Sequence, residues 1–441
     1  MTSKSQTAGK ILGGISAMPI LILLTAGSAL TAQTETVLRN FPGLSSGQTT
    51  NSGLVADAAG NLYGTSTFSG PFGLGTLFEL SPPAAGQTAW SYKTLHNFGV
   101  FPTDGQFPNS PSLIFDAAGN LYGTTAFGGR DDGGTVFELS PQPDGTWKEK
   151  ILRGFNNTVT GPFNPTSVIF DAAGNLYCTS NGGFYGNGAI FELSPNPAGG
   201  VWTVKMLHSF PSFPTDGFEP NGGLVIDAAG NLYGTTFMGG NRTASNVRGT
   251  VFELSPPAVA GGKWTETILH DFGVGPGDPS DGWDPLAGLV RDAAGNLYGT
   301  TFNGGTFDSN NTGGTVFEVS PVPGGGWTET VLHNFSQNHV DGFWPTAGVT
   351  LDAAGNLYGT ASAGGANVDS PTYVLGVVFE LSPPAPGGTT WTETILHPFG
   401  AGKDGTNPGS NVIFDGAGNL YGTTNNGGTR QNGGVVWQVT P

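Results

Sequence analysis

The stretch DAAGNLYGTT (116–125) decides the fold, because nearly the same ten residues occur seven times in the chain. Successive copies start about 60 residues apart, and a fixed period of this length is typical of repeat architectures built from one small structural unit. The first residues of the seven copies are Asp57, Asp116, Asp171, Asp227, Asp292, Asp352 and Asp415.

Each repeat contains four short runs rich in Val, Ile, Phe, Tyr, Thr and Trp, separated by Gly, Pro, Asp and Asn. In the second repeat the runs are 112–116, 120–125, 134–141 and 146–155. This composition predicts four antiparallel strands, and no helical period is sustained after the first 32 residues. The D-A-A-G-N segment predicts a tight hairpin whose Asp accepts hydrogen bonds from its own turn. It offers too few oxygens for Ca²⁺, so we expect no metal and no cofactor.

Four strands in each of seven repeats predict an all-β, seven-bladed β-propeller, in which each blade is stable only against its neighbours. The last repeat has three runs, and TETVLRNF (34–41), which matches TETILHDF (265–272), supplies the fourth. We therefore expect 34–41 to pair with the last repeat and close the ring without a free edge. The blades are expected at about 52–99, 110–156, 165–211, 221–273, 286–336, 346–400 and 409–441 plus 34–42, within a domain of 33–441.

Residues 1–32 differ from the rest of the chain. Lys4 and Lys10 precede an apolar run with small residues at its end, which predicts a secretory signal peptide; an uncleaved membrane anchor is the alternative. No later apolar run is long enough to span a membrane. We expect a secreted protein, either extracellular, periplasmic or held at the cell surface, and a monomer.

Charge and cysteine content narrow the possible partners. The formal net charge of −17 disfavours nucleic acid, because phosphate backbones would be repelled. The only cysteine, Cys178, excludes an internal disulfide. It occupies the place that Gly holds in the other six repeats, so we expect it to be packed in the interior rather than to act as a nucleophile.

The repeated pattern LIFDAAGNLYGTT…GGTVFELSP resembles the glycine-rich Gloeo/Verruco (GloVer) tandem repeat over 52–441. This resemblance implies an exported bacterial protein and implies no activity. Some members carry a C-terminal anchor, and we expect none in this chain. The D-x-x-G-N-L-Y hairpin is more weakly similar to NHL-type and lactonase-like propellers, which supports only the strand order.

Candidate ligand-binding residues come from the variable side of the repeats. An Asp-Gly-x-x-Pro segment, followed closely by aromatic residues, precedes the first strand of five repeats, and such loops are expected near the mouth of a central channel. Aromatic rings beside carboxylates can stack on sugars and bind hydroxyl groups. Wedging of these rings between blades is the alternative. The candidates are Asp216, Phe218, Asp281, Trp283, Asp341, Phe343 and Trp344.

Residues that break the repeat pattern are candidates for chemistry at the channel, and they are Glu219, Asp284, Arg291 and His339. The other five histidines share an L-H-x-F position that Arg39 and Arg153 also occupy, so we interpret them as structural donors. The sequence identifies no catalytic residue. It favours a binding scaffold for a glycan or another surface protein. An extracellular hydrolase or lyase acting on a polysaccharide or lactone is one alternative, and a passive surface component is another.

Overall fold

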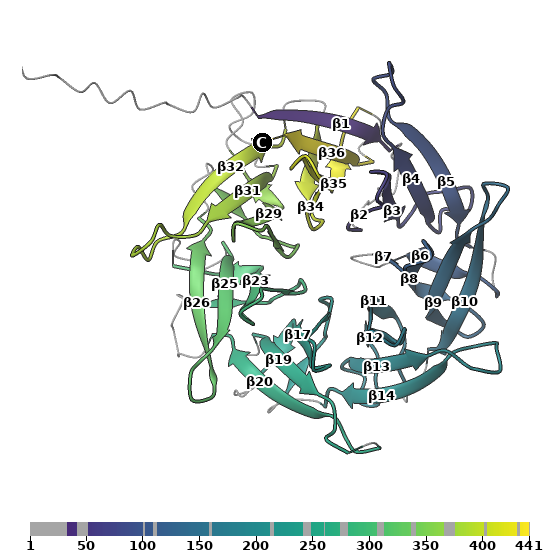
Figure 1. Cartoon of the computed structure of the whole chain (residues 1–441), viewed down its shortest axis with the longest axis horizontal. Helices are drawn as coiled ribbons and strands as arrows, with labels where there is room; N and C mark the ends of the chain where they lie inside the picture. Colours follow the sequence, from purple (N-terminus) through teal and green to yellow (C-terminus); the bar gives the residue numbers. More distant parts are fainter. Residues whose placement is uncertain are drawn as a thin grey trace, which may run out of the picture. The chain divides into compact units, whose positions relative to one another are not determined.

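The computed structural model describes residues 33–41, 52–99, 102–108, 113–157, 161–211, 216–240, 248–259, 261–273, 281–306, 313–336, 341–365, 375–400, 404–429 and 433–440. Within these ranges the chain forms strands, turns and bends without a helix. Seven small sheets surround a central axis, as the view down that axis shows (Figure 1). The sequence-based prediction of a seven-bladed β-propeller with four antiparallel strands per blade is therefore confirmed.

Chain order and spatial order agree in every blade, so the first strand of each repeat lies nearest the axis and the fourth lies outermost (Figure 1). Blade 1 consists of β2 (Val55–Ala56), β3 (Leu62–Ser66), β4 (Thr76–Ser81) and β5 (Ser91–Asn97). Blade 2 consists of β7 (Ile114–Phe115), β8 (Leu121–Gly128), β9 (Asp132–Pro141) and β10 (Trp147–Asn156). Blade 3 consists of β11 (Pro165–Phe170), β12 (Leu176–Ser180), β13 (Ala189–Ser194) and β14 (Thr203–Ser209).

The next three blades repeat this plan. Blade 4 consists of β16 (Val225–Ile226), β17 (Leu232–Thr236), β19 (Thr250–Ser255) and β20 (Thr265–Asp271). Blade 5 consists of β22 (Val290–Arg291), β23 (Leu297–Thr301), β25 (Thr315–Pro321) and β26 (Trp327–Asn334). Blade 6 consists of β28 (Thr350–Leu351), β29 (Leu357–Ala361), β31 (Val377–Ser382) and β32 (Thr392–Pro398).

Blade 7 closes the ring with strands from both ends of the propeller. It consists of β34 (Ile413–Phe414), β35 (Leu420–Gly427), β36 (Val435–Thr440) and β1 (Thr34–Asn40). β1 pairs antiparallel with β36 from Thr34↔Thr440 to Asn40↔Val435 (Figure 1). The predicted closure by residues 34–41 is thus confirmed.

Short additional strands form where the Asp-Gly-x-x-Pro segments pair with the end of the following second strand or the loop after it. Two of them join a blade sheet: β6 (Gly105–Pro108) pairs with β8, and β33 (Gly405–Pro408) pairs with β35. Three form separate pairs: β15 (Gly217–Phe218) with β18 (Met238–Gly239), β21 (Gly282–Trp283) with β24 (Asn303–Gly304), and β27 (Gly342–Phe343) with β30 (Ala363–Gly364).

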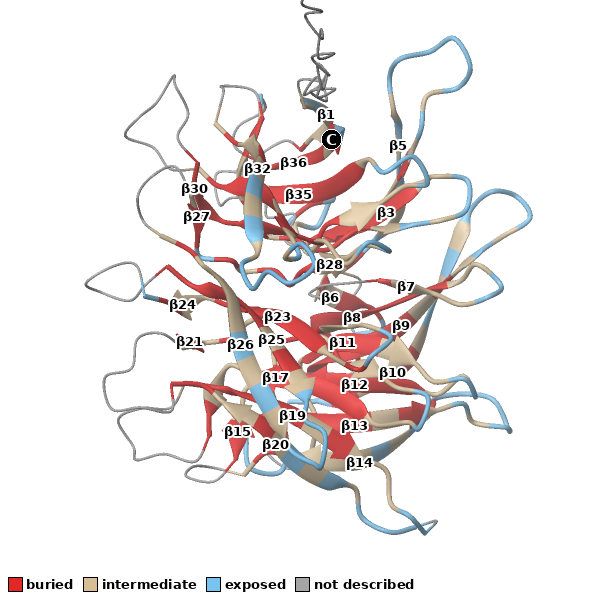
Figure 2. Cartoon of the chain, turned by 60° about the vertical axis from the view of Figure 1, so that its left-hand side comes forward, coloured by how far each residue is buried: buried red, intermediate tan, exposed pale blue. Residues whose placement is uncertain are grey.

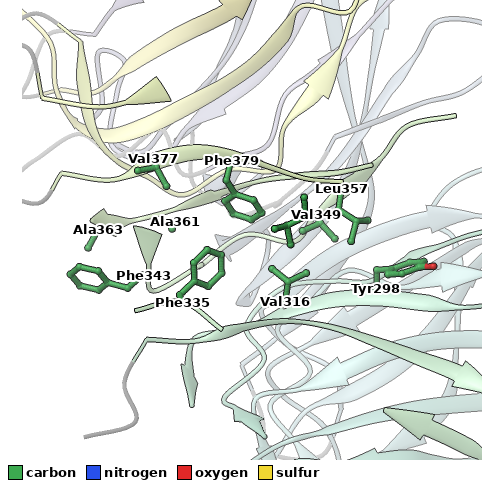
Figure 3. Close-up of a cluster of buried hydrophobic side chains, with 11 residues drawn as sticks. Tyr298, Val316, Phe335, Phe343, Val349, Leu357, Ala361, Ala363, Val377 and Phe379 are labelled. Carbon is green, nitrogen blue, oxygen red and sulfur yellow. The ribbon is translucent and has the colours of Figure 1, made fainter. Parts of the chain in front are cut away.

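The hydrophobic core is divided into seven clusters, each between two adjacent blades, which explains why no single blade would be stable alone. Between blades 5 and 6, for example, Val316 and Phe335 pack against Leu357 and Phe379 (Figure 3). The first five residues of each second strand are buried, whereas the outer strands alternate between exposed and partly buried residues (Figure 2).

The D-A-A-G-N hairpins have the predicted turn chemistry. Asp116 Oδ1 accepts hydrogen bonds from the backbone N–H groups of Ala118 and Asn120, and Oδ2 accepts from the Asn120 amide and the Tyr122 hydroxyl, all within 2.8–3.0 Å. The contacts of this carboxylate with the Asn and the Tyr recur in the other six hairpins, for example at Asp415. Each Asp thus fixes both its own turn and the first residues of the buried second strand.

Candidate functional site

The strand order divides the loops between two faces of the propeller. The hairpin face carries the D-A-A-G-N turns and the loops between the third and fourth strands of each blade. The loop face carries the segments after the second strands together with the Asp-Gly-x-x-Pro segments. Because successive strands are antiparallel, these two sets of loops lie at opposite ends of the blades.

Exposed aromatic side chains gather on the loop face. In the described part of the chain every large exposed aromatic residue belongs to a segment of that face, and the exposed valines Val201, Val259 and Val322 belong to the hairpin face. The exposed aromatic residues are Phe68, Phe72, Phe127, Phe184, Tyr185 and Trp344, with exposed fractions from 36% to 62%. An accumulation of exposed rings on one side of a protein is typical of a binding surface.

A continuous aromatic row crosses blades 1 and 2. The ring of Phe107 lies 5.4 Å from that of Phe68 and 6.0 Å from that of Phe127 between ring centroids. A second aromatic pair lies next to blades 5 and 6, where the ring of Trp344 stacks on that of Phe302 with 5.9 Å between centroids.

The residue before the proline of each Asp-Gly-x-x-Pro segment, and of the matching segment 161–165 that precedes β11, has a strained backbone. Its φ lies between 52° and 62°, a region that non-glycine residues rarely adopt. Asn tolerates this conformation best, yet only two blades use it. The residues at this position are Phe107, Asn164, Glu219, Asp284, Trp344 and Asn407. The conformation directs a different side chain onto the loop face in nearly every blade.

The three candidate aspartates of the Asp-Gly-x-x-Pro segments lie against the outer strands. Asp216 Oδ2 lies 3.1 Å from His208 Nε2, and its side chain is 8% exposed. Asp281 and Asp341 make the corresponding contacts with His270 at 3.3 Å and His333 at 3.4 Å. Each of these carboxylates therefore contacts a histidine on the outer strand of the preceding blade.

The candidate aromatic residues occupy different environments. Phe343 is buried in the cluster between blades 5 and 6 (Figure 3), and Phe218 packs against the cluster between blades 3 and 4. Trp283 is partly buried, and the Arg248 guanidinium lies 4.0 Å above its ring. Among these four candidates only Trp344 is exposed.

The residues that break the repeat pattern are not brought together. Glu219 and Asp284 occupy the strained position on the loop face, whereas Arg291 ends β22 where the chain enters a hairpin on the opposite face. Burial raises the pKa of Asp284, although the Asn303 amide donates a hydrogen bond to it at 2.9 Å. His339 lies outside the described residues. The structure therefore does not assemble the described members of this group into one reaction centre.

A cavity on the axis is lined mainly by small residues that follow the Asp-Gly-x-x-Pro segments, such as Asn221, Gly288, Ala347 and Ser410. Within the described residues its lining contains no Asp, Glu, His, Lys or Arg. Backbone groups are fixed here by hydroxyl donors, for example from Thr300 Oγ1 to the Ala347 carbonyl at 2.8 Å.

The five L-H-x-F histidines are positioned by a β-bulge in each outer strand. In blade 1, Leu77 pairs with His96 and Phe78 pairs with Thr94, so Leu95 is the extra residue of the bulge. The bulge turns the leucine toward the core between blades and directs the following His to the interface with the next blade. The same register shift occurs in all seven outer strands.

Each of these histidines meets two carboxylates, and we call this group an interblade cluster. His96 Nε2 lies 3.2 Å from Asp104 Oδ2 and 3.7 Å from Glu149 Oε2, with Glu149 contributed by the outer strand of the next blade. In four clusters one ligand-type atom from each residue lies within 4.8 Å of the others. They are His96–Asp104–Glu149, His208–Asp216–Glu266, His270–Asp281–Glu329 and His333–Asp341–Glu393. His397, Asp404 and Glu35 occupy the same positions at a fifth interface.

Burial and the neighbouring aspartate disfavour ionisation of the glutamates. Burial first, and then the charge of Asp104, raises the pKa of Glu149 to about 9. Glu266 and Glu393 have their pKa raised to about 9 for the same reasons. Burial would also raise the pKa of Asp104, but its contacts with His96 and the Gly99 N–H lower it overall. In these three clusters, burial and the neighbouring aspartate therefore favour the protonated form of the glutamate.

The glutamates of the interblade clusters were not recognised when each repeat was inspected by itself. The sequence does contain a signal for them. Glu occurs on the outer strand of a blade only where the preceding blade has the His and the segment between the two blades has the Asp. The two interfaces that have Arg39 and Arg153 instead have Tyr92 and Val204 at the glutamate position. The guanidinium of Arg39 lies 4.0 Å above the Tyr92 ring.

The Gloeobacter/Verrucomicrobia repeat matches residues 28–247 and, in an overlapping second match, residues 164–437. These matches together span nearly the whole chain and include residues of every blade. The chain belongs to the Gloeobacter/Verrucomicrobia repeat family. The resemblance inferred from the repeated motif is confirmed, and no curated protein matches this member of the family.

Solved structures share the fold of this Gloeobacter/Verrucomicrobia repeat protein at low sequence identity. The surface component PorZ of the type-IX secretion system of Porphyromonas gingivalis is 14% identical, with a TM-score of 0.51, over 91% of this chain and 47% of PorZ. The extracellular domain of a hybrid two-component system from B. thetaiotaomicron is 11% identical, with a TM-score of 0.50, over 91% of this chain and 40% of that one.

A gluconolactonase from Xanthomonas campestris is 14% identical, with a TM-score of 0.39, over 74% of this chain and 84% of the enzyme. That similarity is too low to support any conclusion about activity. The chain spans less than half the length of the other two proteins, so only the propeller fold is shared with them. Among the described residues, no helix has the length and apolarity needed to cross a membrane.

Proposed function

We propose that this Gloeobacter/Verrucomicrobia repeat protein is a secreted or surface-exposed binding scaffold whose loop face binds a neutral glycan. The observation that carries the proposal is the restriction of exposed aromatic side chains to that face in the described part of the chain. Aromatic rings stack on the apolar faces of sugar rings. The net charge of −17 disfavours anionic ligands and supports a neutral one.

The strained position before the proline supports the same face. Holding Phe107 or Trp344 at a φ of 54° or 60° costs about 1–2 kcal/mol, and Asn would reduce that cost. A strained backbone retained under a ring is most simply explained by a contact that the ring makes. Of the sequence-predicted ligand residues, Trp344 is therefore the one we assign to the binding surface, together with Phe68, Phe107 and Phe127.

Binding to an array of neutral oligosaccharides tests this proposal. The double variant Phe68→Ala/Phe127→Ala removes two exposed rings, and we expect affinity to fall about tenfold or more. Val201→Ala/Val259→Ala, on the hairpin face, is the matched control and should bind as the unmodified protein does. The proposal is wrong if no saccharide binds, or if the loop-face variant retains full affinity.

A hydrolase or lyase with its site at the channel remains a secondary hypothesis from the sequence. It requires a histidine and acids outside the repeat pattern within hydrogen-bond distance of one another. The described residues around the axial cavity do not supply that group, and His339 lies outside them.

A further inference from the structure

We propose that four of the seven blade interfaces each bind one divalent transition-metal ion, Zn²⁺ by preference, through one His, one Asp and one Glu. The sites are the four interblade clusters with ligand atoms within 4.8 Å of one another, at His96, His208, His270 and His333. This differs from the sequence analysis, which expected no metal and interpreted the histidines as structural donors.

The distances in the clusters are close to those between ligands around a common ion. The His nitrogen lies 3.1–3.4 Å from the Asp oxygen in all four clusters and 3.5–3.7 Å from the Glu oxygen in three of them. Three N or O ligands in tetrahedral positions around Zn²⁺ are about 3.3–3.6 Å apart. Charge-assisted hydrogen bonds between an imidazolium and a carboxylate are shorter, about 2.7–2.9 Å.

Two buried oxygen atoms of one cluster have no donor among the residues that the structure describes. They are Asp216 Oδ1 and Glu266 Oε1, both inaccessible to solvent and without a hydrogen-bond partner in that part of the chain. The Asp216 side chain is only 8% exposed. A dication between these carboxylates would satisfy their lone pairs and balance their two charges while the histidine stays neutral.

The seven interfaces act as an internal comparison. Five have His, Asp and Glu together, and the two with Arg have neither acid at the matching positions. If the histidine served only as a positive charge, Arg would fill that role better, and the acids would be expected beside Arg39 and Arg153. The acids are instead absent where the imidazole is absent, as expected for three ligands that function only as a set.

The ligand types favour Zn²⁺ over Ca²⁺. One imidazole nitrogen and two carboxylates suit a first-row transition ion, whereas Ca²⁺ needs six to eight oxygen ligands. The histidine side chains are 16–21% exposed, which leaves a path for the ion and room for water as a fourth ligand. Each ion would tie the outer strand of one blade to the outer strand of the next.

The test measures zinc content and thermal stability of the full chain after EDTA treatment and after addition of Zn²⁺. We expect about four ions per chain and a higher Tm with zinc than with EDTA. Glu149→Gln should remove one equivalent and reduce the shift in Tm, because an amide is a poor substitute for the carboxylate ligand. His339→Gln, which removes the one histidine outside the L-H-x-F motif, is the control and should change neither value.

Two results would overturn the proposal. The first is the absence of zinc binding and of any change in Tm at micromolar zinc. The second is zinc binding whose stoichiometry is unchanged in Glu149→Gln and in Glu266→Gln, which would identify adventitious binding elsewhere. If a shared proton takes the place of the metal, both Gln variants should be at least as stable as the unmodified protein, and EDTA should not change their Tm.

Discussion

Close packing at the glycine in the middle of each second strand leads to a specific prediction for Gly123→Ala. A Cβ atom at position 123 would lie 2.8 Å from Leu113 Cδ2 and 2.8 Å from Phe137 Cζ, whereas carbon atoms in contact prefer about 3.5–4.0 Å. Both neighbouring side chains are fully buried, so neither can move into solvent.

The expected cost follows from these contacts. Overpacking of a core costs about 1–3 kcal/mol, and the lower entropy of the unfolded chain returns up to about 1 kcal/mol. We therefore expect Gly123→Ala to lower the free energy of unfolding by about 1–2 kcal/mol. Blade 3 indicates how the cost is relieved, because Cys178 replaces the glycine where Val168 replaces the leucine, and both are fully buried.

The double variant Gly123→Ala/Leu113→Val reproduces the arrangement of blade 3. Leu113→Val alone should cost about 1 kcal/mol through the lost methylene. If the shorter side chain makes room for the new methyl group, the double variant should be about 1 kcal/mol more stable than the sum of the two single changes predicts.

Urea denaturation, followed by the midpoint at constant m-value, provides the measurement. Gly416→Ala is the matched control, since its Cβ meets nothing within 4 Å and the other six hairpins have Ala there. It should be neutral or slightly stabilising. Strict additivity of the two single changes, or a Gly123→Ala variant as stable as the control, would refute the argument from crowding at Leu113.

Three further predictions concern the strained loop, the tryptophans and the pH. Glu219→Gly should raise the free energy of unfolding by about 1 kcal/mol in urea, because the residue has a φ of 58°; an unchanged midpoint would mean that the backbone is not strained there. Trp283→Ala should cost about 2–3 kcal/mol, because Arg248 and the core between blades 4 and 5 cover the ring, whereas the exposed Trp344→Ala should cost less than about 1 kcal/mol; equal melting temperatures would contradict this. Burial alone would raise the pKa of Asp57, Asp116, Asp227, Asp352 and Asp415, but hydrogen bonds from the neighbouring Asn and Tyr lower it below the ordinary value of 3.8. Their contribution to stability is therefore complete above that value and is lost as the pH falls below it, so Tm measured from about pH 6 to about pH 2.5 should fall mainly below about pH 4; a Tm that is constant over this range would exclude the effect.

The sequence was sufficient for the fold because the deciding interactions are local and repeated. The D-A-A-G-N hairpin satisfies its own carboxylate, as at Asp116, and the match of 34–41 with 265–272 predicts closure without knowledge of distant contacts. The lengths of the strands were harder to predict from the sequence. Of the described residues 113–116 in the predicted run 112–116, only Ile114–Phe115 form strand β7, because inter-strand pairing and not hydrophobicity ends a strand.

The candidate site was harder to infer because its parts come from different repeats. The aspartates of the Asp-Gly-x-x-Pro segments were expected at the channel. They instead contact histidines of the outer strands, and the β-bulges that position these histidines have no recognisable residue pattern. Exposure also depends on neighbours. Phe343 and Trp344 are adjacent in sequence, yet one is buried in the core and the other stacks on Phe302 at the surface.

Two kinds of repeat position follow opposite rules, and the contrast separates scaffold from binding surface. At the interblade clusters His, Asp and Glu are kept or lost as a group, which is expected where three side chains function only as a set. At the strained position before the proline, the six described segments keep the costly φ but change the side chain, from Phe107 to Glu219 to Trp344. Packing alone does not explain a position whose backbone conformation costs free energy while its side chain varies, because packing would select Gly or Asn there. The variation is therefore expected to reflect what the loop face contacts, and the same position in other members of the family should differ more than any residue of the clusters.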